Sequence, residues 1–233
     1  MQQAYDKYSG TYDELDGGAA AEALGFPQLR QELLREARGH VLEVAVGTGL
    51  NLPYYSWGPQ RQEPPGQGQQ KGPGQEAPAP SGVTALETVD LSPGMLAQAR
   101  RRVAAAEALS SRPISFTQAD VAALPFPDSS FDSVVDTFSL CVFPDPQAAL
   151  NEMARVVSPR SSGGRVLLLE HARSDNPLLA AYQDATAGPV AALGKGCVWN
   201  QDVEGMAARA GLEVLRSERA AGGTVELLVA ARR

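Results

Sequence analysis

Hydrophobic residues along the chain fall into two kinds of run. Short uninterrupted runs rich in Val, Ile and Leu predict strands buried on both faces, and longer runs with an apolar residue every three or four positions predict helices. The predicted strands lie at 41–46, 83–90, 114–118, 131–138 and 165–170, followed by an antiparallel hairpin at 212–219 and 224–232. The predicted helices lie at 19–39, 91–109, 146–157 and 202–210, with a short one beginning near residue 50 and a looser region at 172–200.

Strands and helices alternate along almost the whole length. This order is typical of an α/β, Rossmann-like three-layer sandwich, in which helices cover both faces of a mostly parallel sheet. We therefore expect residues 1–233 to form a single domain.

The N-terminal 39 residues are expected to be a helical segment outside the sheet. Tyr5, Tyr8 and Tyr12 recur at helical spacing, and Leu24, Leu29, Leu33 and Leu34 supply an apolar face further on. A lid over a pocket and a docking face for the core are both compatible with this pattern.

Residues 58–82 interrupt the pattern. Six Gly, six Pro and six Gln make up 18 of these 25 residues, a composition too poor in apolar side chains to offset the entropy of ordering. The sequence predicts a disordered insertion, acting as a spacer or as a docking tail. It connects a helix to the next strand, so we expect it at the sheet edge opposite a ligand crevice.

The composition narrows the functional classes. The net charge of −7 argues against a nucleic-acid-binding face, and the basic triplet at 100–102 is interpreted as a solvated helix end. Two cysteines provide neither a disulfide framework nor metal-ligand spacing, so no metal is expected. No apolar run reaches the length of a membrane span, although peripheral membrane contact stays open. We expect an intracellular protein, organellar or cytoplasmic, of undetermined oligomeric state.

Candidate chemistry begins directly after the first strand. Gly47 and Gly49 follow a buried run, where glycine permits a sharp turn and a close approach of backbone N–H groups to a ligand. Glu43 interrupts that run and needs a hydrogen-bond donor. Asp90 ends the second strand, and without the insertion it follows Glu43 by 22 positions, close to the spacing of a ribose-binding acid in dinucleotide folds. Asp120 ends the third strand.

Four segments in this order carry a family resemblance: LEVAVGTGLN, VDLSPGMLAQAR, QADVAALPFPDSSFD, and FSLCVF with the following ALNEMARVVSP. Together they resemble class I S-adenosylmethionine (SAM)-dependent methyltransferases, in the style of the ubiquinone/menaquinone-biosynthesis superfamily and its organellar, membrane-associated members. The resemblance implies a seven-stranded sheet of order 3-2-1-4-5-7-6 with the last strand antiparallel, and SAM as cofactor.

The resemblance also implies the cofactor contacts. Glu43 would orient the methionine amino group, Asp90 would accept both ribose hydroxyls, Leu91 and Met95 would pack on the adenine, and Asp120 with the Val121 amide would bind its edge. The full implied set is Glu43, Ala45, Gly47, Thr48, Gly49, Asn51, Asp90, Leu91, Met95, Asp120, Val121 and Thr137. The chain departs from the family pattern at Ala45, where glycine is usual.

Methyl transfer from a sulfonium requires alignment, exclusion of water and, for a protonated acceptor, a base. Glu170 and His171 end the fifth strand and are the candidate catalytic pair, and His171 has a suitable ordinary pKa. Tyr12, Cys141, Trp199 and Asn200 are candidates for the acceptor pocket. Each also has an ordinary interpretation as a packing residue.

Three functions remain open. The leading one is methyl transfer to a small, apolar acceptor by in-line displacement. The second is a catalytically silent methyltransferase-like scaffold or assembly subunit. The third, a nicotinamide-dependent oxidoreductase, leaves Asp120 without a role.

Overall fold

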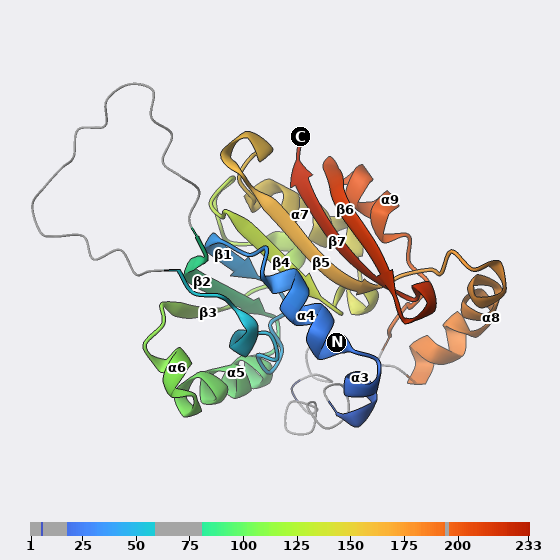
Figure 1. The fold of residues 1–233 in the computed structure, drawn as a ribbon, viewed down its shortest axis with the longest axis horizontal. Coiled ribbons are helices and arrows are strands. Elements are labelled where there is room, and N and C mark those ends of the chain that lie inside the picture. Colours follow the sequence, from blue (N-terminus) through green and yellow to red (C-terminus); the bar gives the residue numbers. More distant parts are fainter. Residues whose placement is uncertain (1–5, 7–17, 59–80, 194–195) are drawn as a thin grey trace, which may run out of the picture.

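The computed structural model describes residue 6 and residues 18–58, 81–193 and 196–233. Its centre is one seven-stranded sheet with the order β3-β2-β1-β4-β5-β7-β6, which confirms the expected topology (Figure 1). The strands are β1 (Gly39–Glu43), β2 (Val83–Asp90), β3 (Ile114–Gln118), β4 (Ser133–Thr137), β5 (Arg165–His171), β6 (Leu212–Ala220) and β7 (Val225–Arg232).

The strand directions follow from the lengths of the connections. β1 to β5 are parallel to one another, and each pair of consecutive strands is joined by a connection far longer than a hairpin turn. β7 runs antiparallel to both β5 and β6, and a short turn at Ala221–Gly223 joins it to β6. The last strand is therefore the antiparallel one, as expected.

Helices cover both faces of the sheet and complete three layers. On one face, α4 (Phe26–Leu34) and α5 (Pro93–Ala105) bury Leu33, Leu34 and Leu96 against the strands. On the other face, α7 (Pro146–Val156) and α9 (Val203–Arg209) bury Leu150 and Met153 among others. The short helices are α3 (Ala19–Ala23) and α6 (Glu107–Ser110).

Three of the predicted helices differ from the structure. The helix expected over 19–39 is broken after α3, and Leu24, assigned to its apolar face, is 53% exposed. The helix expected over 91–109 is interrupted at Ala106, which has extended dihedral angles. After β1, only a 3-10 turn at Leu52–Tyr54 follows the glycine turn.

The region expected to be loose at 172–200 contains a helix, α8 (Pro177–Leu193). Asn176 begins it by accepting hydrogen bonds from the Leu178 and Leu179 amides. α8 lies at the edge of the molecule in Figure 1, and Leu178 and Leu193 on it are 84% and 90% exposed. None of the helices within the described ranges is both long and apolar enough to cross a lipid bilayer.

The Gly/Pro/Gln-rich segment begins and ends at one point of the fold. Residues 59–80 lie outside the described residues, but Gly58 donates to the Val83 carbonyl (3.0 Å) and Val83 donates to that of Ser56 (2.8 Å). Val83 begins β2, so both ends of the segment meet at the N-terminal end of that strand.

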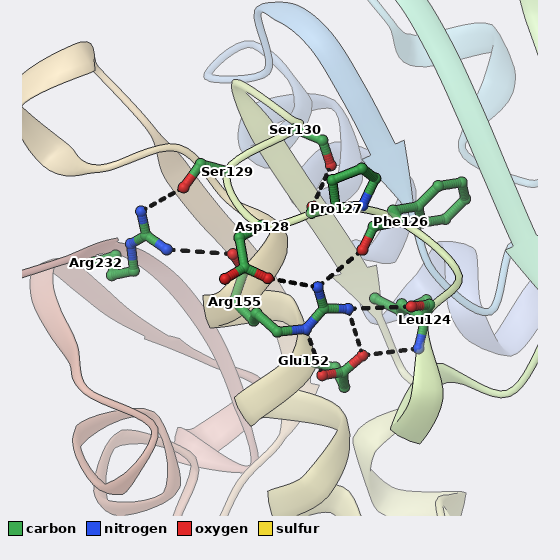
Figure 2. A network of polar contacts seen from close by, with 9 residues as sticks. All are labelled: Leu124, Phe126, Pro127, Asp128, Ser129, Ser130, Glu152, Arg155 and Arg232. Carbon is green, nitrogen blue, oxygen red and sulfur yellow. Dashed lines mark hydrogen bonds and ion pairs between the residues drawn. The ribbon is translucent and has the colours of Figure 1, made fainter.

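A polar network fixes the loop that carries the LPFPDSS stretch (Figure 2). The Arg155 guanidinium on α7 donates to the carbonyls of Leu124 and Phe126 and pairs with Glu152 and Asp128. The pairing lowers the pKa of Glu152 through its hydrogen bond to Arg155. The loop therefore holds the preceding turn, Val121–Ala123, against α7.

Candidate cofactor and acceptor site

The carboxyl ends of four parallel strands meet around one cavity. Ligands of open α/β sheets bind at this edge, outside the strand ends. The cavity is lined by Ala45, Gly47, Asp90, Leu91, Ser92, Met95, Asp120, Val121, Thr137, Phe138, Ser139, Val142, Phe143 and Pro144. Eight of these belong to the cofactor set implied by the sequence.

The turn after β1 needs unusual backbone angles. β1 ends at Glu43, earlier than expected, and Ala45 then adopts φ 48°, a left-handed conformation that favours glycine. Gly47 also has a positive φ, and a Cβ added to it would face open space in which the nearest atom is the Ala45 carbonyl oxygen at 3.9 Å. Gly49 is required for packing, because its Cβ would lie 2.6 Å from Leu52 Cδ1.

Asp90 joins the glycine turn to the start of α5. Its Oδ2 accepts from the Gly47 amide (2.9 Å) and its Oδ1 from the Ser92 amide (2.8 Å). The side chain is only 9% exposed, and this burial raises its pKa above the ordinary value. Each carboxylate oxygen has a second acceptor position, so Asp90 can still accept from a vicinal diol.

The other nucleoside candidates lie close to Asp90. Leu91 is 36% exposed and Met95 is buried, and both line the cavity. Asp120 Oδ1 accepts from the Ala122 amide (2.9 Å) and so caps the Val121–Ala123 turn. Asp120 also lines the cavity, so the capping bond leaves a ligand role open to it. Asp90 and Asp120 thus face one cavity from adjacent strands.

Glu43, Thr48, Gly49 and Asn51 are not among the residues that line the cavity. Glu43 is buried and accepts from the Asn51 amide (3.0 Å) and the Tyr55 hydroxyl (2.8 Å). Its burial raises the pKa to about 7. The donor that this buried acid needs is supplied by the protein.

The sequence analysis missed Arg30. From α4, its Nη1 donates to Asn51 Oδ1 (2.7 Å) and to Thr137 Oγ1 (2.7 Å), and its guanidinium lies 5.1 Å from the Phe138 ring centre. Thr137 lines the cavity, so Arg30 brings a cation to its rim. In the sequence Arg30 resembles any polar helix position, and only the fold distinguishes it.

The segment after β4 forms the apolar end of the cavity through Phe138, Val142, Phe143 and Pro144. Phe138 has φ 56°, an unfavourable conformation for a bulky side chain, and its amide donates to the Leu169 carbonyl (2.8 Å). Such strain persists only where the surroundings enforce it.

Glu170 was expected at the crevice mouth, and this position was wrong. It is fully buried beneath Ser139, whose amide donates to Glu170 Oε1 (3.1 Å). The Ser139 hydroxyl donates to Asp136, also fully buried, and the two carboxyl groups hydrogen-bond each other. Desolvation raises the pKa of Asp136 to about 7, and desolvation together with the adjacent Asp136 raises the pKa of Glu170 well above its ordinary value.

His171 is half-buried at the end of β5. His171 is not among the residues that line the cavity. Its ring centre lies 5.2 Å from the ring centre of Phe138, which does line it.

The remaining acceptor-pocket candidates are not brought to the cavity. Cys141 is buried behind its wall, Trp199 packs edge-on against Tyr182 (6.0 Å), and Asn200 donates to Asp184 (3.0 Å) on α8. Tyr12 lies outside the described residues.

Comparison with known proteins identifies the family of the chain. Residues 71–167 match the family model of the methyltransferase domain, a stretch that begins after the first strand and the glycine turn. The chain is 35% identical over 180 residues to a phosphatidylethanolamine N-methyltransferase of Cereibacter sphaeroides, covering 76% of this chain and 71% of that protein. It is 47% identical over 81 residues to a demethylmenaquinone methyltransferase of Thermus thermophilus, which covers only 35% and 34% of the two chains.

Among solved structures, the [4+2]-cyclase SpnF superposes with a TM-score of 0.69 at 17% identity, covering 99% of this chain and 94% of that chain. This likeness shows the fold alone, since one fold supports several reactions.

The fold is that of a class I, Rossmann-like α/β protein. The relatives establish its family: the chain belongs to the SAM-dependent methyltransferases.

Proposed function

We propose that the chain transfers the methyl group of SAM to a small apolar or amphiphilic acceptor by in-line displacement. The observation that carries the proposal is the make-up of one cavity, to which β2 and β3 bring two acids and the segment after β4 brings four apolar residues. Asp90 and Asp120 suit the hydroxyl and amino donors of an adenosine, and the Phe138 end suits an apolar acceptor.

The methionine part of SAM would lie between these ends, over Gly47 and Thr137. Arg30 would attract its carboxylate, since a guanidinium binds carboxylates well, and Glu43 would act on its amino group through Asn51. SAM supplies the electrophilic methyl carbon. The residues named here orient it and exclude water.

The relatives support an acceptor with an apolar part. The names of two of them specify phosphatidylethanolamine and demethylmenaquinone, each a polar reacting group on an apolar chain. The exposed side chains of Leu178, Tyr182 and Leu193 on α8 support contact with a lipid phase in which such an acceptor is dissolved.

We assign the base, where the acceptor carries a proton, to His171. Glu170 cannot reach an acceptor and would act by holding Ser139 in place. His171→Ala is expected to lower turnover by about 10²-fold and leave the affinity for S-adenosylhomocysteine unchanged, because the ring is away from the nucleoside end. The chain's other histidine, His40, is exposed at the start of β1 and provides the matched control, His40→Ala.

The test of the function is label transfer from isotopically labelled SAM to a cellular lipid extract and, separately, to an aqueous extract. We expect label in the lipid fraction. Label only in the aqueous fraction would contradict the apolar acceptor. Binding of S-adenosylhomocysteine with no label in either fraction would favour the silent scaffold.

A further inference from the structure

The chain's two cysteines are 56 positions apart in sequence but in contact in the fold. Cys141 belongs to the turn Leu140–Val142 and is 4% exposed, whereas Cys197 follows α8 and is partly exposed. Neither cysteine forms a disulfide in the structure, and their side chains hydrogen-bond each other. The pair plays no part in the function proposed above.

The backbone holds the two residues side by side. The Val198 amide donates to the Cys141 carbonyl at 2.7 Å. Each of these atoms lies two covalent bonds from the Cα of its cysteine, so the Cα atoms are at most about 7.5 Å apart. Disulfides span roughly 4.4–6.8 Å between Cα atoms, so this upper bound is within about 1 Å of disulfide range.

Cys141 stands directly behind the apolar wall of the cavity. The next residues, Val142 and Phe143, line the acceptor end, and Ser139 two positions earlier rests on Glu170. Gln201 donates to the Leu140 carbonyl (3.0 Å), so the segment after α8 already touches this turn twice. A disulfide between Cys141 and Cys197 would therefore fix the apolar wall of the cavity to the segment after α8.

We propose that Cys141 and Cys197 are a thiol–disulfide modification site, oxidised reversibly by a low-molecular-weight disulfide, that locks the acceptor end of the cavity. Formation of the bond is independent of the proposed function. Only its effect on methyl transfer rests on that function.

The chemistry balances with oxidised glutathione as oxidant. The Cys197 thiolate attacks one glutathione sulfur, forming a mixed disulfide and releasing one glutathione thiolate. The Cys141 thiolate then attacks the Cys197 sulfur and releases the second. The two thiol protons end on the two released glutathiones, which have been reduced while the protein has been oxidised.

Cys197 is assigned the first step because it is the more accessible sulfur. Its hydrogen bond with Cys141, together with burial, holds the pKa of Cys141 well above its usual range. Cys141 thiolate is therefore scarce, and we expect the closing step to be the slower one.

The test is mass spectrometry of the folded chain after incubation with oxidised glutathione, followed by alkylation. We expect loss of both alkylatable thiols, a peptide cross-linking the two cysteines, and full reversal by dithiothreitol. Cys141→Ser should stop at a stable glutathione adduct on Cys197. Cys197→Ser, at the partly exposed and structurally milder position, should give neither adduct nor cross-link.

Retention of both alkylatable thiols under excess oxidant, or a glutathione adduct on wild-type Cys197 without the cross-link, would overturn the proposal. The same samples are then assayed for S-adenosylhomocysteine binding and for label transfer. We expect unchanged binding, since Asp90 lies at the other end, and reduced transfer that dithiothreitol restores. A chain that forms the cross-link but transfers no label even in its reduced form would refute the proposed function and leave the modification site intact.

Discussion

Asp90→Asn is the sharpest perturbation of the nucleoside end. The substitution keeps the side-chain shape but replaces one carboxylate oxygen by an NH₂ group, which cannot accept a hydrogen bond. Asp90 uses both oxygens on backbone amides, those of Gly47 and Ser92, while it faces the cavity. Asparagine cannot serve both amides and the two hydroxyls of a ribose.

The magnitude follows from the bonds lost. A hydrogen bond to a charged group contributes about 1.5–3 kcal/mol, so weakening the two ribose bonds should cost about 3 kcal/mol. That corresponds to an increase of about 10²-fold in the Kd for S-adenosylhomocysteine. One backbone amide also loses its acceptor, and the free energy of unfolding should fall by about 1 kcal/mol.

Isothermal calorimetry measures the affinity, and urea unfolding measures the stability. Asp132→Asn is the matched control. Asp132 Oδ2 also accepts from a backbone amide, that of His40 (2.8 Å), but this bond lies at the N-terminal end of β1, away from the cavity. We expect a similar loss of stability there and no change in affinity. A folded Asp90→Asn chain with wild-type affinity, or equal weakening in both variants, would refute the ribose role.

Two further predictions concern stability. Ala45→Gly should raise the free energy of unfolding by up to about 1 kcal/mol without weakening nucleoside binding, because it relieves a left-handed alanine at φ 48°; urea unfolding that showed a decrease would contradict the strain. Between about pH 4 and pH 7 the free energy of unfolding should fall as pH rises, because Glu43 and Asp136 keep their protons in the folded state, with pKa values of about 7, while the unfolded chain has lost them. Each such proton makes the free energy of unfolding fall by about 1.4 kcal/mol per pH unit. Asp136→Asn should remove the part of this pH dependence that Asp136 causes. A flat profile in thermal or urea unfolding from pH 4 to pH 7 would show that these acids are not protonated in the fold.

The strands could be predicted well because their sequence signal is local. β2 and β3 have the predicted bounds, 83–90 and 114–118, because each is a short run enriched in Val, Ile, Thr or Phe. The sheet order could not come from those runs; it came from the family resemblance.

α8 was missed for an equally local reason. Gly188 and Pro189 suggested an irregular segment, yet Pro189 lies inside the helix. The Asn176–Pro177 pair was the better indicator, because a capping asparagine followed by proline is a helix start.

In the candidate site, too, only the residues with a local sequence signal could be predicted. Asp90 and Asp120 could be found because each ends a strand, and parallel strand ends converge. Glu170 also ends such a strand, but whether an acid there faces solvent or is covered depends on the Ser139 turn. No local pattern contains that information, and the same holds for the placement of Arg30.

The acids at the strand ends therefore form two groups with different physical consequences. Asp90 and Asp120 face the cavity and retain acceptor capacity for a ligand. Glu43, Asp136 and Glu170 are covered, and their desolvation lowers stability near neutral pH. A fold can retain buried acids in spite of this cost where their hydrogen bonds fix a backbone segment that apolar packing alone would not fix. Here Glu170 and Asp136 hold Ser139, the residue after the strained Phe138, and so fix the turn that separates the polar end of the cavity from its apolar end.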